Sequence, residues 1–288
     1  MIQLTVTDVR AVPGDSAFLI DDGETSVLYD TGFGFTGFQI GNNIEKILGN
    51  RQLDYIFLTH SHYDHALGSA YILQKYPHAK VVAGTYAKKI FEKPSARAVM
   101  RQLDQSAART YGIHSYPDLI DGLKVDISLE DADPLACGRM RFTAVALPGH
   151  TRCSMGFYLE ENKLLLGTET LGVYFGKGTY LPSYLVGYEM TMESFRKAKA
   201  LDIESILLPH YGIVTGQEAA DYLTHSEAIA RDIAAKVQQL LRQGKSKEQI
   251  LQHFEQTYYQ KHVEAVYPRE AFLLNSRIMI DLLEKELE

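Results

Sequence analysis

Three histidines and an aspartate lie within six positions of the chain, at His60, His62, Asp64 and His65. They directly follow the apolar segment Tyr55–Leu58, which predicts a buried strand. Neutral imidazoles and carboxylates are the ligands that zinc and similar divalent metals bind in proteins. On an extended chain His60 and His62 point to the same side and can reach one ion. Asp64 and His65, around the turn, can reach a second ion. The spacing therefore predicts a metal site after this strand.

Three more candidate ligands, His150, Glu169 and His210, each follow a short apolar segment. These segments predict further strands, at 142–147, 163–166 and 206–208. A strand that ends in a polar loop is how α/β proteins position reactive groups along a sheet edge. Together, five histidines and two carboxylates predict two clusters of three ligands and one bridging residue.

The chain resembles the metallo-β-lactamase-fold hydrolases in four motifs. These are H-x-H-x-D-H at 60–65, Pro-Gly-His-Thr at 148–151, the acidic position 169 and the strand-end His210. The segment Asp30-Thr31-Gly32 is similar to the family's aspartate-threonine-glycine turn. The resemblance covers about residues 1–215. It implies an α/β fold, namely a four-layer αββα sandwich.

The resemblance also implies a ligand set for two divalent metal ions, with zinc expected and iron or manganese as alternatives. His60, His62 and His150 would bind one ion, and Asp64, His65 and His210 the other. Glu169 occupies the position where the family usually has a bridging aspartate after glycine, whereas this chain reads Thr168-Glu169. The longer side chain must reach further or fold back, so metal identity, spacing and occupancy of the second site stay open. The alternative is that Glu169 is a surface residue.

Four residues are candidates for roles other than metal binding, and one of them, Asp64, is also a predicted ligand. Asp64 is expected to accept a hydrogen bond from the attacking water and to act in catalysis. Asp30 is a candidate acceptor that orients a ligand histidine through its second ring nitrogen. Tyr174 and Tyr211 are candidates for contact with the substrate, although clustered tyrosines more often serve packing.

The composition limits the classes of function. The 288 residues carry a net charge of −7, which argues against a nucleic-acid ligand because backbone binding needs concentrated lysine and arginine. Only Cys137 and Cys153 occur, without the spacing of a disulfide framework or a cysteine-rich zinc site. Neither a signal-peptide pattern nor a membrane-spanning segment is recognised, so a cytoplasmic enzyme is expected.

The predicted organisation is a metallo-β-lactamase-like domain at 1–214 and a C-terminal helical extension at 215–288. A polar, helix-prone segment at about 85–118 carries Arg101 and Arg109 on helical spacing and is followed by His114. It predicts either an inserted lid beside the site or a solvated surface helix. The extension predicts three helices, at 217–242, 246–262 and 268–287. It resembles the quinolone-signal thioesterase-like branch in length and pattern. These helices are expected to wall the substrate pocket or to form the face of a homodimer, and the alternative is a purely structural brace.

The leading functional hypothesis is a dinuclear metal-dependent hydrolase with a small-molecule substrate. The scissile bond would be that of an ester, thioester, lactone or phosphoester. Two alternatives are a metal-binding but non-catalytic signalling or regulatory protein of the same fold, and a true β-lactamase. Processing of RNA or DNA is disfavoured by the acidic balance.

Overall fold

The computed structural model describes residues 1–260 and 262–286, which divide into two compact units. The first unit comprises residues 1–146 and 153–167, and the second comprises residues 147–152 and the chain from Thr168. The predicted domain boundary between 214 and 215 stays a prediction. Position 261 and the last two positions of the predicted extension, 287 and 288, lie outside the described residues.

The first unit contains a six-stranded sheet in which the strands follow their order in the chain. The strands are β1 (Thr5–Asp8), β2 (Phe18–Asp21), β3 (Ser26–Tyr29), β4 (Tyr55–Leu58), β5 (Lys80–Gly84) and β6 (Ile127–Leu129). The pairs β1–β2 and β2–β3 are antiparallel, and β3 to β6 are parallel neighbours. The carboxyl ends of β3 and β4 therefore lie at one edge, where the Asp30 turn and the histidine motif follow.

A second set of strands in this unit is antiparallel throughout. It consists of β7 (Pro134–Cys137), β8 (Met140–Ala146), β9 (Met155–Leu159) and β10 (Leu164–Leu166). The ring of Phe57 on β4 lies 5.0 Å from that of Phe142 on β8 and 4.5 Å from that of Phe157 on β9. These contacts pack the two sheets of the unit face to face.

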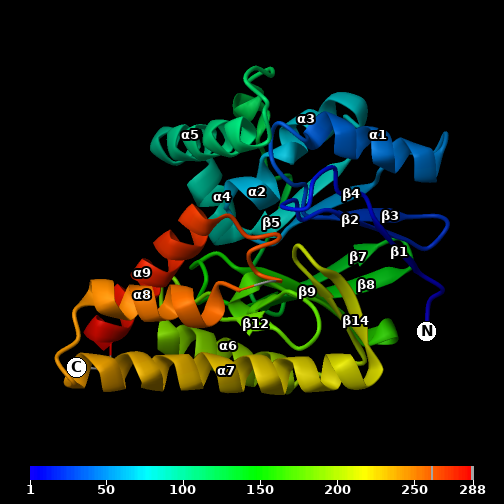
Figure 1. Ribbon diagram of the computed structural model, residues 1–288. Helices are drawn as coiled ribbons and strands as arrows, with labels where there is room; N and C mark the ends of the chain where they lie inside the picture. The colour runs from blue at the N-terminus through cyan, green and yellow to red at the C-terminus, as the bar shows by residue number, and fades with distance from the viewer. Residues whose placement is uncertain (261, 287–288) are drawn as a thin grey trace. The chain divides into compact units, whose positions relative to one another are not determined.

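The opposite face of the first sheet is covered by α1 (Gly37–Leu48) and α3 (Gly68–Lys75), which run side by side (Figure 1). Ile56 and Leu58, the neighbours of Phe57, share a buried core with Ile40 and Ile44 of α1. Alternate residues of β4 thus face the helices and the second sheet, as the period of two requires. Because β4 is buried on both faces, its sequence is apolar at every position except the partly exposed Tyr55.

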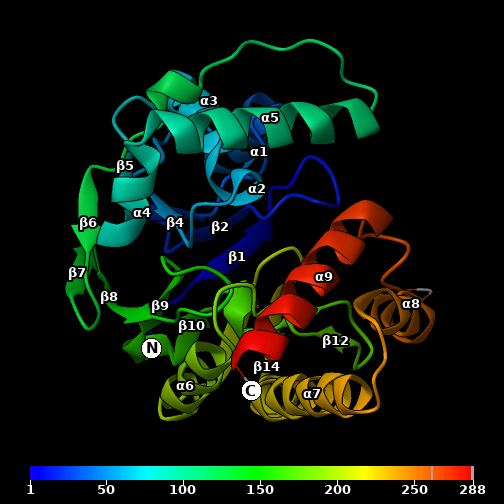
Figure 2. The same ribbon diagram turned by 90° about the vertical axis from the view of Figure 1, so that its left-hand side faces the viewer.

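The helix-prone segment of the first unit forms α4 (Thr85–Phe91) and α5 (Pro94–Thr110). After α5 the chain runs back along the helix without regular structure until the short turn at Ile120–Gly122 (Figure 2). Only Met100, Asp104 and Ala108 of α5 are buried. These residues are four positions apart, so they form one narrow buried stripe along the helix.

The second unit is mainly helical. Its elements are β11 (Val173–Tyr174), β12 (Tyr180–Leu181), α6 (Tyr188–Lys199), β13 (Ser205–Leu208), β14 (Gly212–Thr215), α7 (Gly216–Arg242), α8 (Lys247–Tyr258) and α9 (Arg269–Glu286). The three predicted C-terminal helices are thus present, although α8 ends four residues before the predicted end at 262. The predicted helix start is an N-terminal capping box, in which the Ser246 side chain accepts from the backbone of Gln249 and the Gln249 side chain accepts from that of Ser246.

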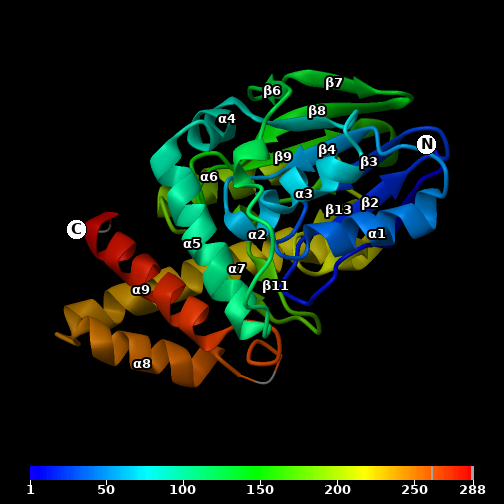
Figure 3. The same ribbon diagram turned by 90° about the horizontal axis from the view of Figure 1, so that it is seen from above.

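The helices α8 and α9 pack side by side, and α9 also contacts α6 and α7 (Figure 3). The predicted apolar stripe of α9 is buried at Phe272, Ile280 and Leu283 and partly exposed at Leu273. Other helices of the same unit cover this stripe. No helix among the described residues is long and apolar enough to cross a membrane.

Candidate metal centre

The histidine motif begins just after β4 and extends into the short helix α2 (Tyr63–Ala66), which contains Asp64 and His65. His60 and His65 are completely buried, and their ring centroids lie 4.1 Å apart. The rings of His60 and His62 are 4.6 Å apart. A hydrophobic strand end followed at once by a helical turn thus gathers three imidazoles in a small volume.

Asp30 holds this motif from the end of the neighbouring strand β3. Its buried carboxylate accepts from the Thr59 backbone N at 2.8 Å, from the Thr59 hydroxyl at 3.0 Å and from the Ser16 hydroxyl at 3.0 Å. It also lies 2.7 Å from Nδ1 of His65. Asp30 has a φ of 54°, a left-handed conformation that is uncommon outside glycine and is often found at functional sites.

These contacts set the tautomers of two histidines. The carboxylate of Asp30 makes Nδ1 of His65 a donor, so Nε2 is the atom with a lone pair. The Thr59 hydroxyl donates to Asp30 and lies 3.0 Å from Nδ1 of His60, so it accepts from that nitrogen. The contact that the predicted role of Asp30 requires is therefore present. Thr59 takes part in the same network, although the sequence pattern assigned it no role.

In the second unit, His150 is oriented by Ser183. Its Nδ1 lies 3.0 Å from the Ser183 carbonyl oxygen and 2.8 Å from the Ser183 hydroxyl. The preceding Gly149 has a φ of 143°, and a Cβ there would lie 2.1 Å from Oγ1 of Thr191. Only glycine fits at this point of the Pro-Gly-His-Thr motif. Sequence reasoning missed Ser183 because no local pattern links it to a histidine 33 positions earlier.

Glu169 lies between two histidines of the second unit. Its Oε2 atom is 2.8 Å from Nε2 of His150, and its Oε1 atom is 3.4 Å from Nε2 of His210. His210 has a φ of 61°, the second site residue after Asp30 in this strained region. The Glu169 side chain is only 12% exposed. Its role as a bridging ligand stays a prediction.

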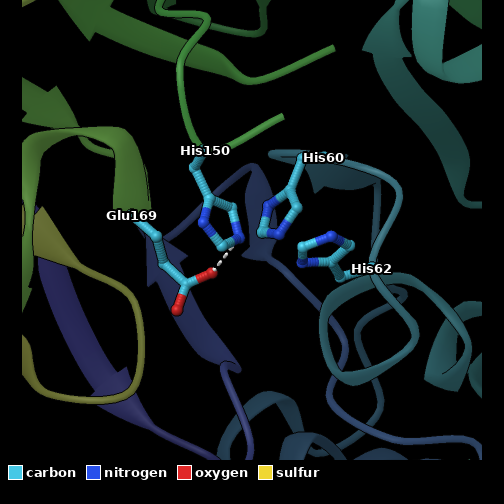
Figure 4. Close-up of side chains that lie close together, drawn as sticks. All are labelled: His60, His62, His150 and Glu169. Atoms are coloured by element: carbon cyan, nitrogen blue, oxygen red, sulfur yellow. Dashed lines mark ion pairs between the residues drawn. The ribbon is translucent and has the colours of Figure 1, made fainter. Parts of the chain in front are cut away.

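The candidate ligand atoms form two groups. Atoms of His60, His62, His150 and Glu169 lie within 4.8 Å of one another (Figure 4), and those of Asp64, His65 and His210 meet the same limit. The groups contain the two predicted ligand sets, with Glu169 in the first. Whether these residues bind metal stays a prediction.

The donor set fits divalent ions such as zinc. It consists of imidazole nitrogen atoms, which suit zinc and iron, and of carboxylate oxygen atoms, which suit manganese as well. Two ligands of a tetrahedral ion with bonds of about 2.0–2.2 Å are separated by roughly 3.4 Å. The separation of 3.4 Å between Glu169 and His210 equals this value, whereas the 2.8 Å between Glu169 and His150 is a direct hydrogen-bond distance.

The two candidate tyrosines belong to an aromatic cluster in the second unit. The Tyr174 hydroxyl donates to Glu218 at 2.8 Å, and its ring lies 4.5 Å from that of Tyr211. Burial raises the pKa of Tyr174 to about 12, so its hydroxyl stays protonated at neutral pH. Tyr211 is 37% exposed. Packing and a hydrogen bond therefore explain the position of the Tyr174 side chain. A role of Tyr174 or Tyr211 in substrate contact stays a prediction.

Residues 12–210 match the family described as the metallo-beta-lactamase superfamily. This span includes every candidate ligand from His60 to His210. The chain belongs to the metallo-beta-lactamase superfamily. The predicted family and its mixed α/β fold are therefore confirmed. Members of this superfamily bind divalent metals, and metal-dependent hydrolases are among them.

Two relatives share part of the sequence. The metallo-beta-lactamase fold-containing protein ST1585 of Sulfurisphaera tokodaii is 28% identical over 190 residues, which are 64% of this chain and 70% of the relative. Glyoxylase B2 of Dictyostelium discoideum is 28% identical over 116 residues, or 40% of this chain. That second match spans only 34% of the relative.

Two crystal structures share the fold over nearly the whole chain. The archaeal protein ST1585 from Sulfolobus tokodaii superposes with a TM-score of 0.63 at 21% identity, covering 99% of this chain and 100% of that one. The family protein TTHA1429 from Thermus thermophilus has a TM-score of 0.61 at 19% identity, covering 98% and 93%. The resemblance of the extension to the quinolone-signal thioesterase-like branch stays a prediction.

Proposed function

We propose that this superfamily member is a dinuclear metal-dependent hydrolase acting on a small-molecule ester, thioester, lactone or phosphoester. The observation that carries the proposal is the position of Glu169, whose two carboxylate oxygens each lie near Nε2 of a different histidine. A carboxylate shared in this way suits a bridge between two ions. Zinc is the proposed metal, with iron or manganese as alternatives.

The proposed ligands are His60, His62 and His150 for one ion and Asp64, His65 and His210 for the other, with Glu169 as the bridge. When bound, divalent ions would supply a water of lowered pKa and polarise the oxygen of the scissile bond. Thr59, Asp30 and Ser183 contact Nδ1 of His60, His65 and His150, which leaves Nε2 of these three imidazoles as the proposed ligand atom. Asp64, whose side chain is 23% exposed, would accept a proton from the attacking water.

Metal analysis followed by a substrate panel tests the proposal. Protein purified without added metal should contain about two ions per chain. It should hydrolyse at least one member of a panel of chromogenic esters, thioesters, lactones and phosphodiesters. His62→Ala should lower metal content and rate together. Less than half an ion per chain would contradict the metal centre, whereas two ions without turnover would favour the non-catalytic alternative.

A further inference from the structure

A polar pocket with a volume of about 300 Å³ lies wholly within the first unit, on one side of α5. It is lined by α5, by the irregular segment after it, and by Leu67, Tyr71 and Ile120. The volume is at the lower end of the range of small-molecule sites. Since a water molecule takes about 30 Å³ in the liquid, the pocket has room for a molecule of roughly ten heavy atoms.

The acidic residues of this pocket are already satisfied. Asp104 accepts from the Tyr116 hydroxyl and, at 2.9 Å, from the backbone N of Gly34. Asp118 accepts from the Arg101 guanidinium and from the backbone N of Ile120. The two carboxylates therefore hold the segment after α5 against the helix. The charge of Asp118 is paired with that of Arg101, whereas Asp104 accepts from uncharged donors.

The remaining polar residues of the pocket can all donate hydrogen bonds. Within residues 1–260 and 262–286, the side chains of Gln105, Arg109, His114 and Ser115 form no hydrogen bond or ion pair with another residue. Arg109 carries five N–H donors and a permanent positive charge. Its planar guanidinium matches carboxylate and phosphate groups through two parallel hydrogen bonds. Arg109 is exposed and, among the described residues, is not paired with a carboxylate, so its guanidinium is available to an anion that enters the pocket.

We propose that this pocket binds a small organic anion through a carboxylate or phosphate group. Arg109 anchors the group, and Gln105, His114 and Ser115 supply further hydrogen bonds. The aromatic ring of Tyr71 and the side chains of Leu67 and Ile120 pack against the organic part of the ligand.

The position of the pocket links it to the histidine motif. Leu67 lines the pocket and also caps the C-terminal end of α2, which carries Asp64 and His65. The helices α2 and α5 pack against each other within the same unit. An anion bound beside Leu67 therefore stabilises the arrangement of α2. This link to turnover rests on the proposed function, whereas binding of the anion does not.

Calorimetric titration with inorganic phosphate and with benzoate tests the pocket. Arg109→Ala should weaken binding at least tenfold, because it removes the anchoring charge. The matched control is Arg141→Ala, an exposed arginine on β8 of the same unit, which should stay within twofold of wild type. Because anions also bind metal centres, His62→Ala is titrated in parallel and should keep its affinity. No binding at millimolar concentration, or equal affinities of the Arg109 and Arg141 variants, would overturn the proposal.

Two chromogenic esters distinguish the source of the anion. If it is the acidic group of the substrate, Arg109→Ala should raise KM for mono-4-nitrophenyl succinate and leave 4-nitrophenyl acetate unchanged. If it is a separate effector, benzoate should change the rate on 4-nitrophenyl acetate in the wild type and not in Arg109→Ala. If both esters are hydrolysed and neither Arg109→Ala nor benzoate changes the kinetics, the proposed effect of the bound anion on α2 is contradicted. Absence of all turnover would instead count against the proposed hydrolase, and the titration would still decide the pocket.

Discussion

A single buried aspartate orients two of the seven candidate ligands. Asp30 contacts His65 directly and reaches His60 through the Thr59 hydroxyl. The following Thr31 supports the same loop, since its backbone N and its hydroxyl both lie 2.8 Å from the carbonyl oxygen of His65. In the aspartate-threonine-glycine turn, Asp30 therefore fixes the orientation of the imidazoles, and Thr31 holds the backbone of His65.

Replacing Asp30 with asparagine should weaken metal binding about 10- to 100-fold, the usual effect of losing a residue that orients a ligand. An amide presents one oxygen and one NH2 group, so a donor would face either Thr59 or Nδ1 of His65. Competition with a chromogenic chelator measures the affinity. Ser16→Ala is the matched control, because it removes one hydrogen bond to Asp30 and should leave metal affinity unchanged. Equal affinities of wild type and Asp30→Asn would refute the orienting role.

Glu169 is the residue at which this chain departs from the usual family pattern. Glu169→Asp should keep two ions with an altered rate, because a shorter carboxylate is the commoner bridge. Glu169→Ala should preferentially lose the ion of the Asp64, His65 and His210 set, which then has no bridging oxygen. Metal content by elemental analysis and the rate on the best panel substrate are the readouts. An alanine variant with unchanged metal and rate would assign Glu169 no part in the site.

The sequence predicted the cluster of candidate ligands but not everything that orients them. His60, His62, Asp64 and His65 are adjacent in the chain, so their spacing alone predicts a cluster. Ser183 is distant from His150 in sequence and has no chemistry that marks a serine as a histidine partner. Its role depends on how the loop after β12 folds.

Among the elements, α5 differs most from its predicted character. A polar helix with several arginines predicts a lid or a solvated helix, and most of α5 is indeed exposed. Asp104 is nevertheless 2% exposed and bonded to Gly34 and Tyr116. From sequence alone, an aspartate on a polar helix is expected to face solvent. The partners of Asp104 come from two other segments of the chain, so no local pattern indicates that it is buried.

The burial of Asp104 predicts a dependence of stability on pH. Desolvation raises the pKa of its carboxyl from 3.8 to about 6, so the folded state binds the proton more tightly than the unfolded state. The stability of the wild type relative to Asp104→Asn should therefore fall as the pH rises from about 4 to about 7, by roughly 3 kcal/mol at most. Urea unfolding across this range measures the difference. Asp121→Asn, which changes an exposed aspartate of the same unit, is measured in parallel as the matched substitution.

On the scale of the whole molecule, the C-terminal helices behave as part of a core. Phe272 of α9 is 3% exposed and packs with Leu181 and Val263. The predicted stripe is thus covered within its own unit, and its burial does not require a second copy of the chain. Periodicity predicted the helices and their apolar face, but it does not specify which surface covers that face.

Phe272→Ala should cost about 3–5 kcal/mol of unfolding free energy, as expected for a fully buried aromatic residue. The matched control on the same helix is Leu274→Ala, whose side chain is 56% exposed and should change stability by less than about 0.5 kcal/mol. Urea midpoints give both values. Equal small effects would show that α9 contributes little to the core and would leave it available as a dimer face, which sedimentation analysis would detect.

The central claim is that Glu169 bridges two metal ions held by the predicted histidines. Anomalous diffraction from crystals of the full chain, purified with its own metal, tests it most directly. We expect two peaks about 3.5–4 Å apart, one beside His60, His62 and His150 and one beside Asp64, His65 and His210, with one Glu169 oxygen at each. A single peak, or two peaks with the Glu169 carboxylate turned away from both, would contradict the claim.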